Sequence, residues 1–210
     1  MSEAGLNLNN VRIKINGVSL LNIDEKIADG EILTLMGPSG CGKSTLINAI
    51  CGFLPKGFSC EGEISLDGQN ITDLPAEKRK LGVLFQDPLL FPHFDVKENI
   101  MFALPSGGAK SERLEKAYQL LKNVNMQDYA RRDVATLSGG QKARIALART
   151  LASNPKALLL DEPFSKLDEK LRENVRQSVF EVIRGQNLPT LLVTHDKADA
   201  KATNGKIITL

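Results

Sequence analysis

Four short apolar runs of strand length recur along the chain and predict a buried parallel sheet. These runs end at Met36, Phe85, Leu160 and Thr194. Strands that are apolar throughout, rather than alternating, are typical of parallel sheets covered on both faces. Residues 11–15, 18–27 and 63–66 have the composition of strands but mix polar with apolar positions. We therefore expect these three segments to form an antiparallel outer layer.

The pattern becomes helical between residues 87 and 152. Helix-compatible segments cover residues 96–104, 111–124 and 142–151. Strands before and after such an insertion predict an α/β fold with an inserted helical subdomain. We predict a single domain over residues 1–210. Its α/β core, with the outer β layer, comprises residues 1–86 and 153–210, and the helical subdomain comprises residues 87–152.

A glycine-rich turn follows the apolar run 32–36 and opens a helix-compatible segment. Its residues are Gly37, Pro38, Ser39, Gly40, Cys41, Gly42, Lys43, Ser44 and Thr45. Glycines allow consecutive backbone N–H groups to surround an anion, and the helix N-terminus adds partial positive charge. Lys43 then reaches the β- and γ-phosphates, and the Ser44 hydroxyl binds Mg²⁺. The turn predicts a site for a nucleoside triphosphate, and a plain glycine-rich turn with a surface lysine is the alternative.

Polar side chains end three of the apolar runs. Asp161 and Glu162 follow residues 157–160, Gln86 follows 81–85, and His195 follows 191–194. Catalytic groups of α/β proteins gather at the carboxyl ends of parallel strands. Phosphoryl transfer needs charge neutralisation and a positioned nucleophile. Strand-ending turns and a surface histidine are the alternatives.

Residues 137–141, Leu-Ser-Gly-Gly-Gln, open the helical segment 142–151. Ser138 is well placed to cap that helix. An ordinary cap explains Ser138 but does not explain the two glycines and Gln141.

Together with the glycine-rich turn, these motifs resemble the ATP-binding-cassette (ABC) family, whose ATPase subunits power transport. The resemblance covers almost the whole chain and implies a P-loop NTPase (RecA-like) core with a mainly parallel sheet. It is closest to import-type subunits, particularly the compact YnjD-like ATPases, through the stretch that runs from residues 58–60 to residues 85–87 and on to residues 89–91. The family implies a head-to-tail homodimer that forms on ATP binding. It also implies that this ATP-driven dimerisation and the hydrolysis of ATP power solute transport, with import as the expected direction.

The resemblance implies a role for each position of this chain that matches one of the family's motifs. Asp161 matches the residue that holds Mg²⁺, Glu162 the one that polarises the attacking water, and His195 the switch histidine. Residues 137–141 match the signature motif, which faces the γ-phosphate of the other subunit, and residues 165–168 match the D-loop, with Lys166 in place of a small residue. The resemblance implies catalytic roles for Lys43, Glu162 and His195, Mg²⁺ ligands at Ser44, Gln86 and Asp161, and ATP contacts from residues 37–45, Gln86, Ser138, Gly139, Gly140, Gln141 and Asp168.

Composition bears on partners and location. No apolar stretch approaches the roughly 20 residues of a membrane span, and the first ten residues lack the plan of a signal peptide. We expect the pore to be another chain, an integral membrane permease with or without a solute-binding protein. The expected location is the cytoplasmic face of the inner membrane. The formal net charge of +2 does not indicate a nucleic-acid surface.

Two other functions stay open, and one motif departs from the family. A soluble ABC-type ATPase of a non-transport process would normally carry two cassettes or a coiled-coil arm. A P-loop small-molecule kinase would lack residues 137–141 and need a second substrate pocket. Import ATPases usually stack an aromatic ring on adenine, but residues 12–16 hold none. We expect Ile15 or Lys14 to pack there instead.

Overall fold

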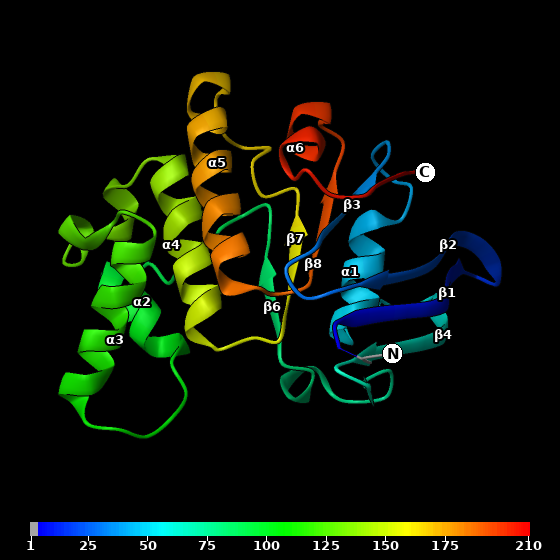
Figure 1. The fold of residues 1–210 in the computed structure, drawn as a ribbon, viewed down its shortest axis with the longest axis horizontal. Coiled ribbons are helices and arrows are strands. Elements are labelled where there is room, and N and C mark those ends of the chain that lie inside the picture. The colour runs from blue at the N-terminus through cyan, green and yellow to red at the C-terminus, as the bar shows by residue number, and fades with distance from the viewer. Residues whose placement is uncertain (1–3) are drawn as a thin grey trace.

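The structure is a computed structural model that describes residues 4–210, without the side chain of Lys170. A parallel sheet runs through the middle of the molecule (Figure 1). Its spatial order is β6-β7-β8-β3-β9, and every registered pair in it is parallel. The strands are β3 (Ile32–Met36), β6 (Leu81–Leu84), β7 (Ala157–Asp161), β8 (Thr190–Thr194) and β9 (Ile207–Thr209). The predicted parallel core is confirmed.

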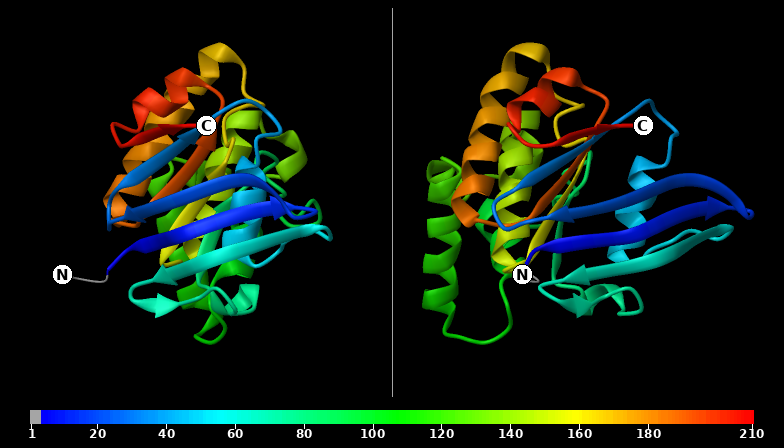
Figure 2. Two further views of the ribbon diagram at one scale, coloured as in Figure 1. Left: turned by 90° about the vertical axis from the view of Figure 1, so that its right-hand side faces the viewer. Right: turned by 45° about the vertical axis from the view of Figure 1, so that its right-hand side comes forward.

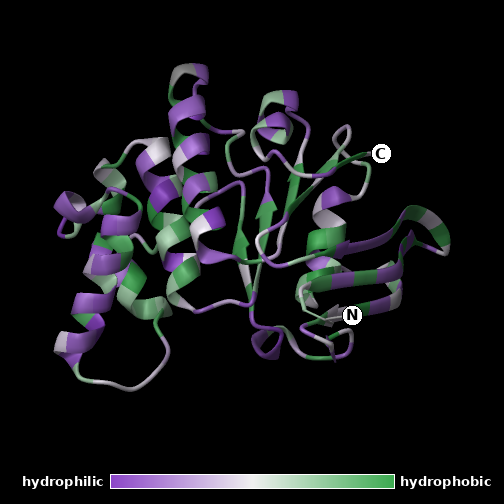
Figure 3. Cartoon of the chain, viewed as in Figure 1, coloured by the Kyte–Doolittle hydropathy of each residue, from purple (hydrophilic) through white to green (hydrophobic). Residues whose placement is uncertain are grey.

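The uninterrupted apolar runs are explained by two cores, one on each face of this sheet. In β7, Leu158 and Leu160 pack into the core beneath the helical region, whereas Leu159 packs into the core around α1 (Lys43–Cys51). All three side chains are fully buried. Alternate residues of a strand point to opposite faces, so a strand buried on both faces must be apolar at every position. Figure 3 shows the resulting hydrophobic strands at the centre of the chain.

A second, antiparallel sheet lies beyond α1, in the order β2-β1-β4-β5 (Figure 2). Its strands are β1 (Leu6–Ile15), β2 (Val18–Ile27), β4 (Phe58–Leu66) and β5 (Gln69–Asn70). The predicted bounds 18–27 match β2, but β1 and β4 begin five residues earlier than predicted. In β1 the register shifts between Leu8 and Val11, where Asn10 has φ 48°. A bulge with exposed polar residues interrupts the alternation and hides the first half of the strand from the sequence pattern.

Helices occupy the other face of the parallel sheet. They are α2 (Val96–Ala103), α3 (Lys110–Asn123), α4 (Gly139–Ala152) and α5 (Glu169–Gln186), and α6 (Lys197–Ala202) follows β8. Short 3₁₀ turns lie at Ala76–Lys78, Gln127–Tyr129 and Val134–Thr136. In Figure 1, α4 lies between α5 and the pair α2 and α3. Of the helices in residues 4–210, none is both long enough and apolar enough to cross a membrane.

Candidate functional site

The sheet order brings the predicted polar residues to one edge. Strands β7, β8 and β3 are parallel neighbours, so their carboxyl ends point the same way. The glycine-rich turn leaves β3, Asp161 ends β7 with Glu162 directly after it, and His195 follows β8. Gln86 lies two residues beyond β6 and is exposed. Three motifs distant in sequence thus lie together where parallel α/β sheets usually bind ligands, and Gln86 follows the neighbouring strand β6.

The glycine-rich turn wraps around the start of α1. Gly42 is the N-cap residue of α1 and has φ 95°, and Gly40 has φ 84°, which is the left-handed region that favours glycine. A β-carbon on Gly42 would also lie 2.9 Å from Cδ2 of Leu20. Lys43 is only 5% exposed, and its Nζ donates to the carbonyls of Gly37 at 2.8 Å and Pro38 at 2.7 Å. The ammonium group is therefore held inside the loop rather than in solvent.

A hydroxyl and a carboxylate join the loop to β7. Ser44 Oγ donates to Asp161 Oδ1 at 3.0 Å. Burial raises the pKa of Asp161, and the hydrogen bond from Ser44 opposes that rise. Hard oxygen donors of this kind, completed by phosphate oxygens and water, suit Mg²⁺. The side chains present therefore fit the predicted metal.

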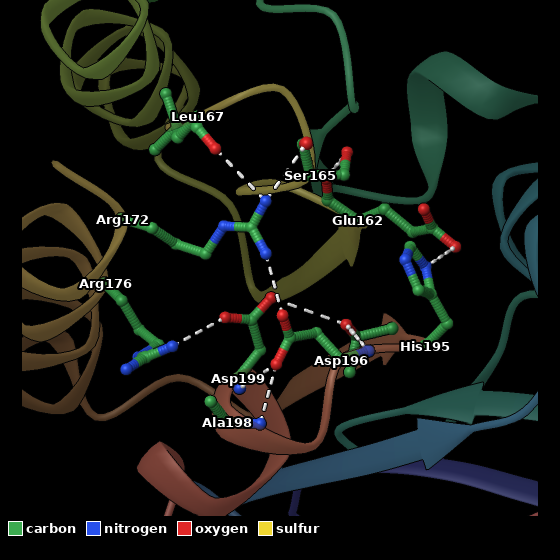
Figure 4. Close-up of polar contacts among 10 residues, drawn as sticks. Glu162, Ser165, Leu167, Arg172, Arg176, His195, Asp196, Ala198 and Asp199 are labelled. Atoms are coloured by element: carbon green, nitrogen blue, oxygen red, sulfur yellow. Dashed lines mark hydrogen bonds and ion pairs between the residues drawn. The ribbon is translucent and has the colours of Figure 1, made fainter. Parts of the chain in front are cut away.

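Glu162 and His195 form the second polar pair at this edge. Glu162 has φ 45°, an uncommon conformation for a residue with a β-carbon, and its N–H donates to Val193 O at 3.0 Å. Its Oε1 lies 3.0 Å from Nδ1 of His195 (Figure 4). The glutamate is 18% exposed and the histidine 52%. With Nδ1 facing the carboxylate, Nε2 is the imidazole nitrogen left for a ligand.

The signature residues cap α4 and pack against α5. Ser138 Oγ accepts from Gln141 N at 3.3 Å, and Gln141 Oε1 accepts from Ser138 N at 2.9 Å, which is a capping box. A β-carbon on Gly140 would lie 2.7 Å from Val175 Cγ2. Close helix packing is thus one reason for that glycine, and the sequence pattern did not indicate it.

Residues 138–141 are not brought to the glycine-rich turn of the same chain. Figure 1 shows α4 and α1 on opposite sides of α5 and α6. The matched D-loop position Asp168 caps α5, where its Oδ1 accepts from Leu171 N at 3.0 Å. Lys166 Nζ lies 3.0 Å from Asp87 Oδ2, so the segment 165–168 also contacts the residue after Gln86.

Acidic residues are distributed unevenly over the helix N-termini. The first turns of α2, α3, α5 and α6 contain Glu98, Glu112, Glu169 and Asp199. Among the six α-helices described, only α1 and α4 have none. Acidic residues stabilise the positive end of a helix, and an anionic ligand does the same. The two helices predicted to meet phosphate are therefore the two that have no acidic residue in the first turn.

The hairpin ahead of the glycine-rich turn carries the surface expected to meet adenine. Lys14 Nζ is 2.6 Å from Glu61 Oε1, so that amine is already paired. Ile15 and its register partner Val18 are exposed apolar residues. Of the two residues expected to replace an aromatic ring, Ile15 is thus the one that offers apolar surface.

Arg149 has a role that the sequence pattern did not indicate. From the last turn of α4 it donates to the carbonyls of Leu89 at 2.7 Å and Pro88 at 3.0 Å. Burial lowers the pKa of its guanidinium. These bonds hold the segment after Gln86 against α4. Backbone acceptors 60 residues away leave no local pattern in the sequence.

This arrangement of strand ends, anion loop and carboxylates defines a P-loop nucleoside triphosphatase. Residues 20–165 match the family model described as ABC transporter. An uncharacterized ABC transporter ATP-binding protein of Escherichia coli strain K12, YnjD, is 47% identical over 194 residues, which are 92% of this chain and 89% of that protein. The chain belongs to the ABC transporter family, and it is one of that family's ATP-binding ATPase subunits.

Importer subunits and a solved cassette are also similar to the chain. The spermidine/putrescine import ATP-binding protein PotA of a Pseudomonas fluorescens strain is 44% identical over 198 residues, covering 92% of this chain and 52% of PotA. The chain thus spans about half the length of that relative. The dimeric structure of the ATP-binding cassette MJ0796 bound to ADP and Pi aligns with TM-score 0.78 and 32% identity, over 98% of this chain and 94% of that one. The resemblance predicted from the motifs is confirmed.

Proposed function

We propose that the chain powers a membrane permease by hydrolysing ATP between two copies of itself arranged head to tail. The observation that carries this proposal is the pair of helix N-termini without first-turn acids, α1 and α4, which lie apart within one chain. A second copy related by a two-fold axis can place its α4 N-terminus against phosphates held at α1. The similarity to a cassette solved as a dimer bound to ADP and Pi supports a dimer of this chain.

Within each site we assign roles from the contacts of the side chains. Residues 37–45 hold the phosphates, with Lys43 inside the loop. Ser44, Asp161 and Gln86 would hold Mg²⁺, which neutralises charge on the transferred phosphoryl group. Glu162 accepts a proton from the attacking water, and His195, bonded through Nδ1 to that glutamate, presents Nε2 to the γ-phosphate.

From the second copy, Ser138, Gly139, Gly140, Gln141 and Asp168 would complete the site. Three of these side chains, those of Ser138, Gln141 and Asp168, already cap their own helices. Capping fixes the geometry of each helix N-terminus before the partner arrives, which lowers the entropy lost on assembly.

We assign residues 87–152 as the subdomain that contacts the permease. Phe91 packs edge-to-face against Phe94 and Phe102, with ring centroids 5.7 and 4.8 Å apart, and Phe102 is 62% exposed. Exposed apolar clusters of this kind mark protein contact surfaces. The relatives named as import ATP-binding proteins favour import. On this proposal the chain lies on the cytoplasmic face of the membrane, bound to the permease.

The test uses Glu162→Gln, which keeps the shape of the side chain but cannot accept the proton. We expect the variant to bind ATP, to form dimers that light scattering detects, and to hydrolyse about 100-fold or more slowly than wild type. Wild type should release phosphate without any phosphorylated acceptor, which a kinase requires. Hydrolysis by the variant near the wild-type rate would refute the assignment of Glu162.

A further inference from the structure

Arg172 lies in the first turns of α5 and contacts three acceptors from two other segments. Its Nη2 donates to Ser165 O at 3.2 Å and to Leu167 O at 3.1 Å. Its Nη1 donates to Asp196 Oδ2 at 2.7 Å (Figure 4). One planar guanidinium thus joins the segment 165–168 to the residue that follows His195. A lysine could not hold the same three acceptors, because it lacks the fixed fork.

Asp196 transmits that contact to His195. Its Oδ1 accepts from Ala198 N at 2.7 Å and Asp199 N at 3.3 Å, which caps α6. Burial acts to raise the pKa of Asp196, but these bonds and Arg172 lower it below its ordinary value. The N–H of Asp196 donates to Thr194 Oγ1 at 3.0 Å. Hydrogen bonds to both carboxylate oxygens of Asp196, and one from its backbone N–H, therefore fix the backbone on the carboxyl side of His195.

The segment 165–168 is tied in turn to Glu162. Ser165 donates to Glu162 O from its backbone N at 3.2 Å and from its hydroxyl at 2.8 Å. The contacts therefore close a ring that runs from Glu162 through Ser165, Arg172 and Asp196 to His195 and returns to Glu162. Within this ring Arg172 is the side chain that spans the two segments.

We propose that Arg172 is a positioning residue for ATP hydrolysis. It holds Glu162 and His195 in their relative positions and links those positions to the segment 165–168. The inference rests on the function proposed above, in which residues 165–168 face the second copy. When that copy docks against the segment, the contacts of Arg172 transmit the effect to Glu162 and His195, the pair that orients the attacking water. Misplacement by about 1 Å can cost about 100-fold in rate, so a link of this kind is expected to act on kcat.

Arg176 supplies a matched control on the same helix. One turn beyond Arg172, its Nη1 pairs with Asp199 Oδ1 at 2.9 Å and also joins α5 to α6. This pair is the more buried one, with side chains 12% and 3% exposed, against 24% and 26% for Arg172 and Asp196. If these arginines served only to hold the helices together, the change at Arg176 would do the greater damage.

The experiment compares Arg172→Lys with Arg176→Lys in the full chain, measuring ATP hydrolysis, ATP affinity and thermal unfolding. We expect Arg172→Lys to lower kcat by at least about tenfold while KM stays within about twofold. Arg176→Lys should unfold at a lower temperature yet keep kcat within about threefold of wild type. Equal kcat values for the two variants would overturn the proposal.

Asp196→Asn tests the same link from its other end, including the case in which Arg172→Lys does not fold. Asparagine caps helices as well as aspartate, so α6 should persist while the charge that Arg172 contacts is lost. The double variant Arg172→Lys/Asp196→Asn should have a kcat no lower than that of the slower single variant, because both changes break the same contact. Additive losses would contradict the proposal.

Glu162→Gln in the same assay separates the two proposals. If Glu162→Gln is inactive while Arg172→Lys behaves like Arg176→Lys, then only the role of Arg172 fails. If Glu162→Gln hydrolyses ATP, the proposed site itself fails.

Discussion

The N-termini of α1 and α4 both lack a first-turn acid, but their first N–H groups are satisfied differently. α1 begins after Gly42, which has no side chain to cap it and lies in the left-handed region at φ 95°. α4 begins after Ser138, at φ −67°, with a complete capping box to Gln141. The N-terminus of α1 therefore has no side-chain cap, whereas the N-terminus of α4 is capped by its own side chains.

The difference reflects what each end is proposed to bind. The α1 end must surround a phosphate chain within one subunit, so a capping side chain would compete with the ligand for backbone N–H groups. The α4 end meets its phosphate only when a second copy docks, so it must hold its shape alone. Its capping box uses the N–H groups of Ser138 and Gln141, and those of Gly139 and Gly140 have no intrahelical acceptor.

The largest expected effect comes from the α1 end. Lys43→Ala removes the ammonium that the loop carbonyls hold, and we expect ATP affinity by calorimetry to fall at least about 100-fold. The fold should persist, because the side chain lies in the ligand loop. Lys142→Ala is the matched control in the first turns of α4 and should leave the affinity of the monomer unchanged. Unchanged affinity in Lys43→Ala would refute the assignment of the loop.

Ser138→Arg tests the α4 end next. A long side chain at the start of α4 would fill the space into which a phosphate of the second copy must fit. We expect the affinity of the monomer for ATP to stay near wild type, while ATP-driven dimerisation and hydrolysis are lost. Light scattering recorded together with phosphate release measures both. Normal hydrolysis by a monomeric variant would mean that residues 137–141 serve only as a helix cap.

A mixture of Ser138→Arg and Lys43→Ala chains sharpens the same comparison. In a head-to-tail heterodimer, one site combines an intact Lys43 with an intact Ser138, and the other site has lost both. The mixture should therefore recover at most one working site per dimer, whereas each homodimer has none. A mixture that hydrolyses ATP as fast as wild type, or a homodimer of either variant that does so, would contradict the head-to-tail arrangement.

Sequence patterns predicted those parts of the molecule that depend on residues close together in the chain. The buried parallel strands follow from continuous apolar runs, and the Ser138 cap follows from residue type and position. The early start of β1 was missed because Asn10 and its bulge break the alternation. Arg149 and Arg172 were missed because backbone carbonyls are most of their acceptors, and any residue type provides a carbonyl. The positions of such acceptors depend on tertiary packing.

Gln141→Glu is the smallest change and the sharpest comparison of the two ends. Glutamate keeps the capping box and adds a first-turn charge, which stabilises a helix by about 0.3–1 kcal/mol. The midpoint of thermal unfolding should therefore stay equal to that of wild type or rise slightly. The same charge would face the phosphate of the second copy, so ATP-driven dimerisation should require about tenfold more ATP. Gln141→Ala is the control without added charge, and it should lower stability and affect dimerisation less. A stabilised Gln141→Glu variant that dimerises like wild type would show that the end of α4 does not meet an anion.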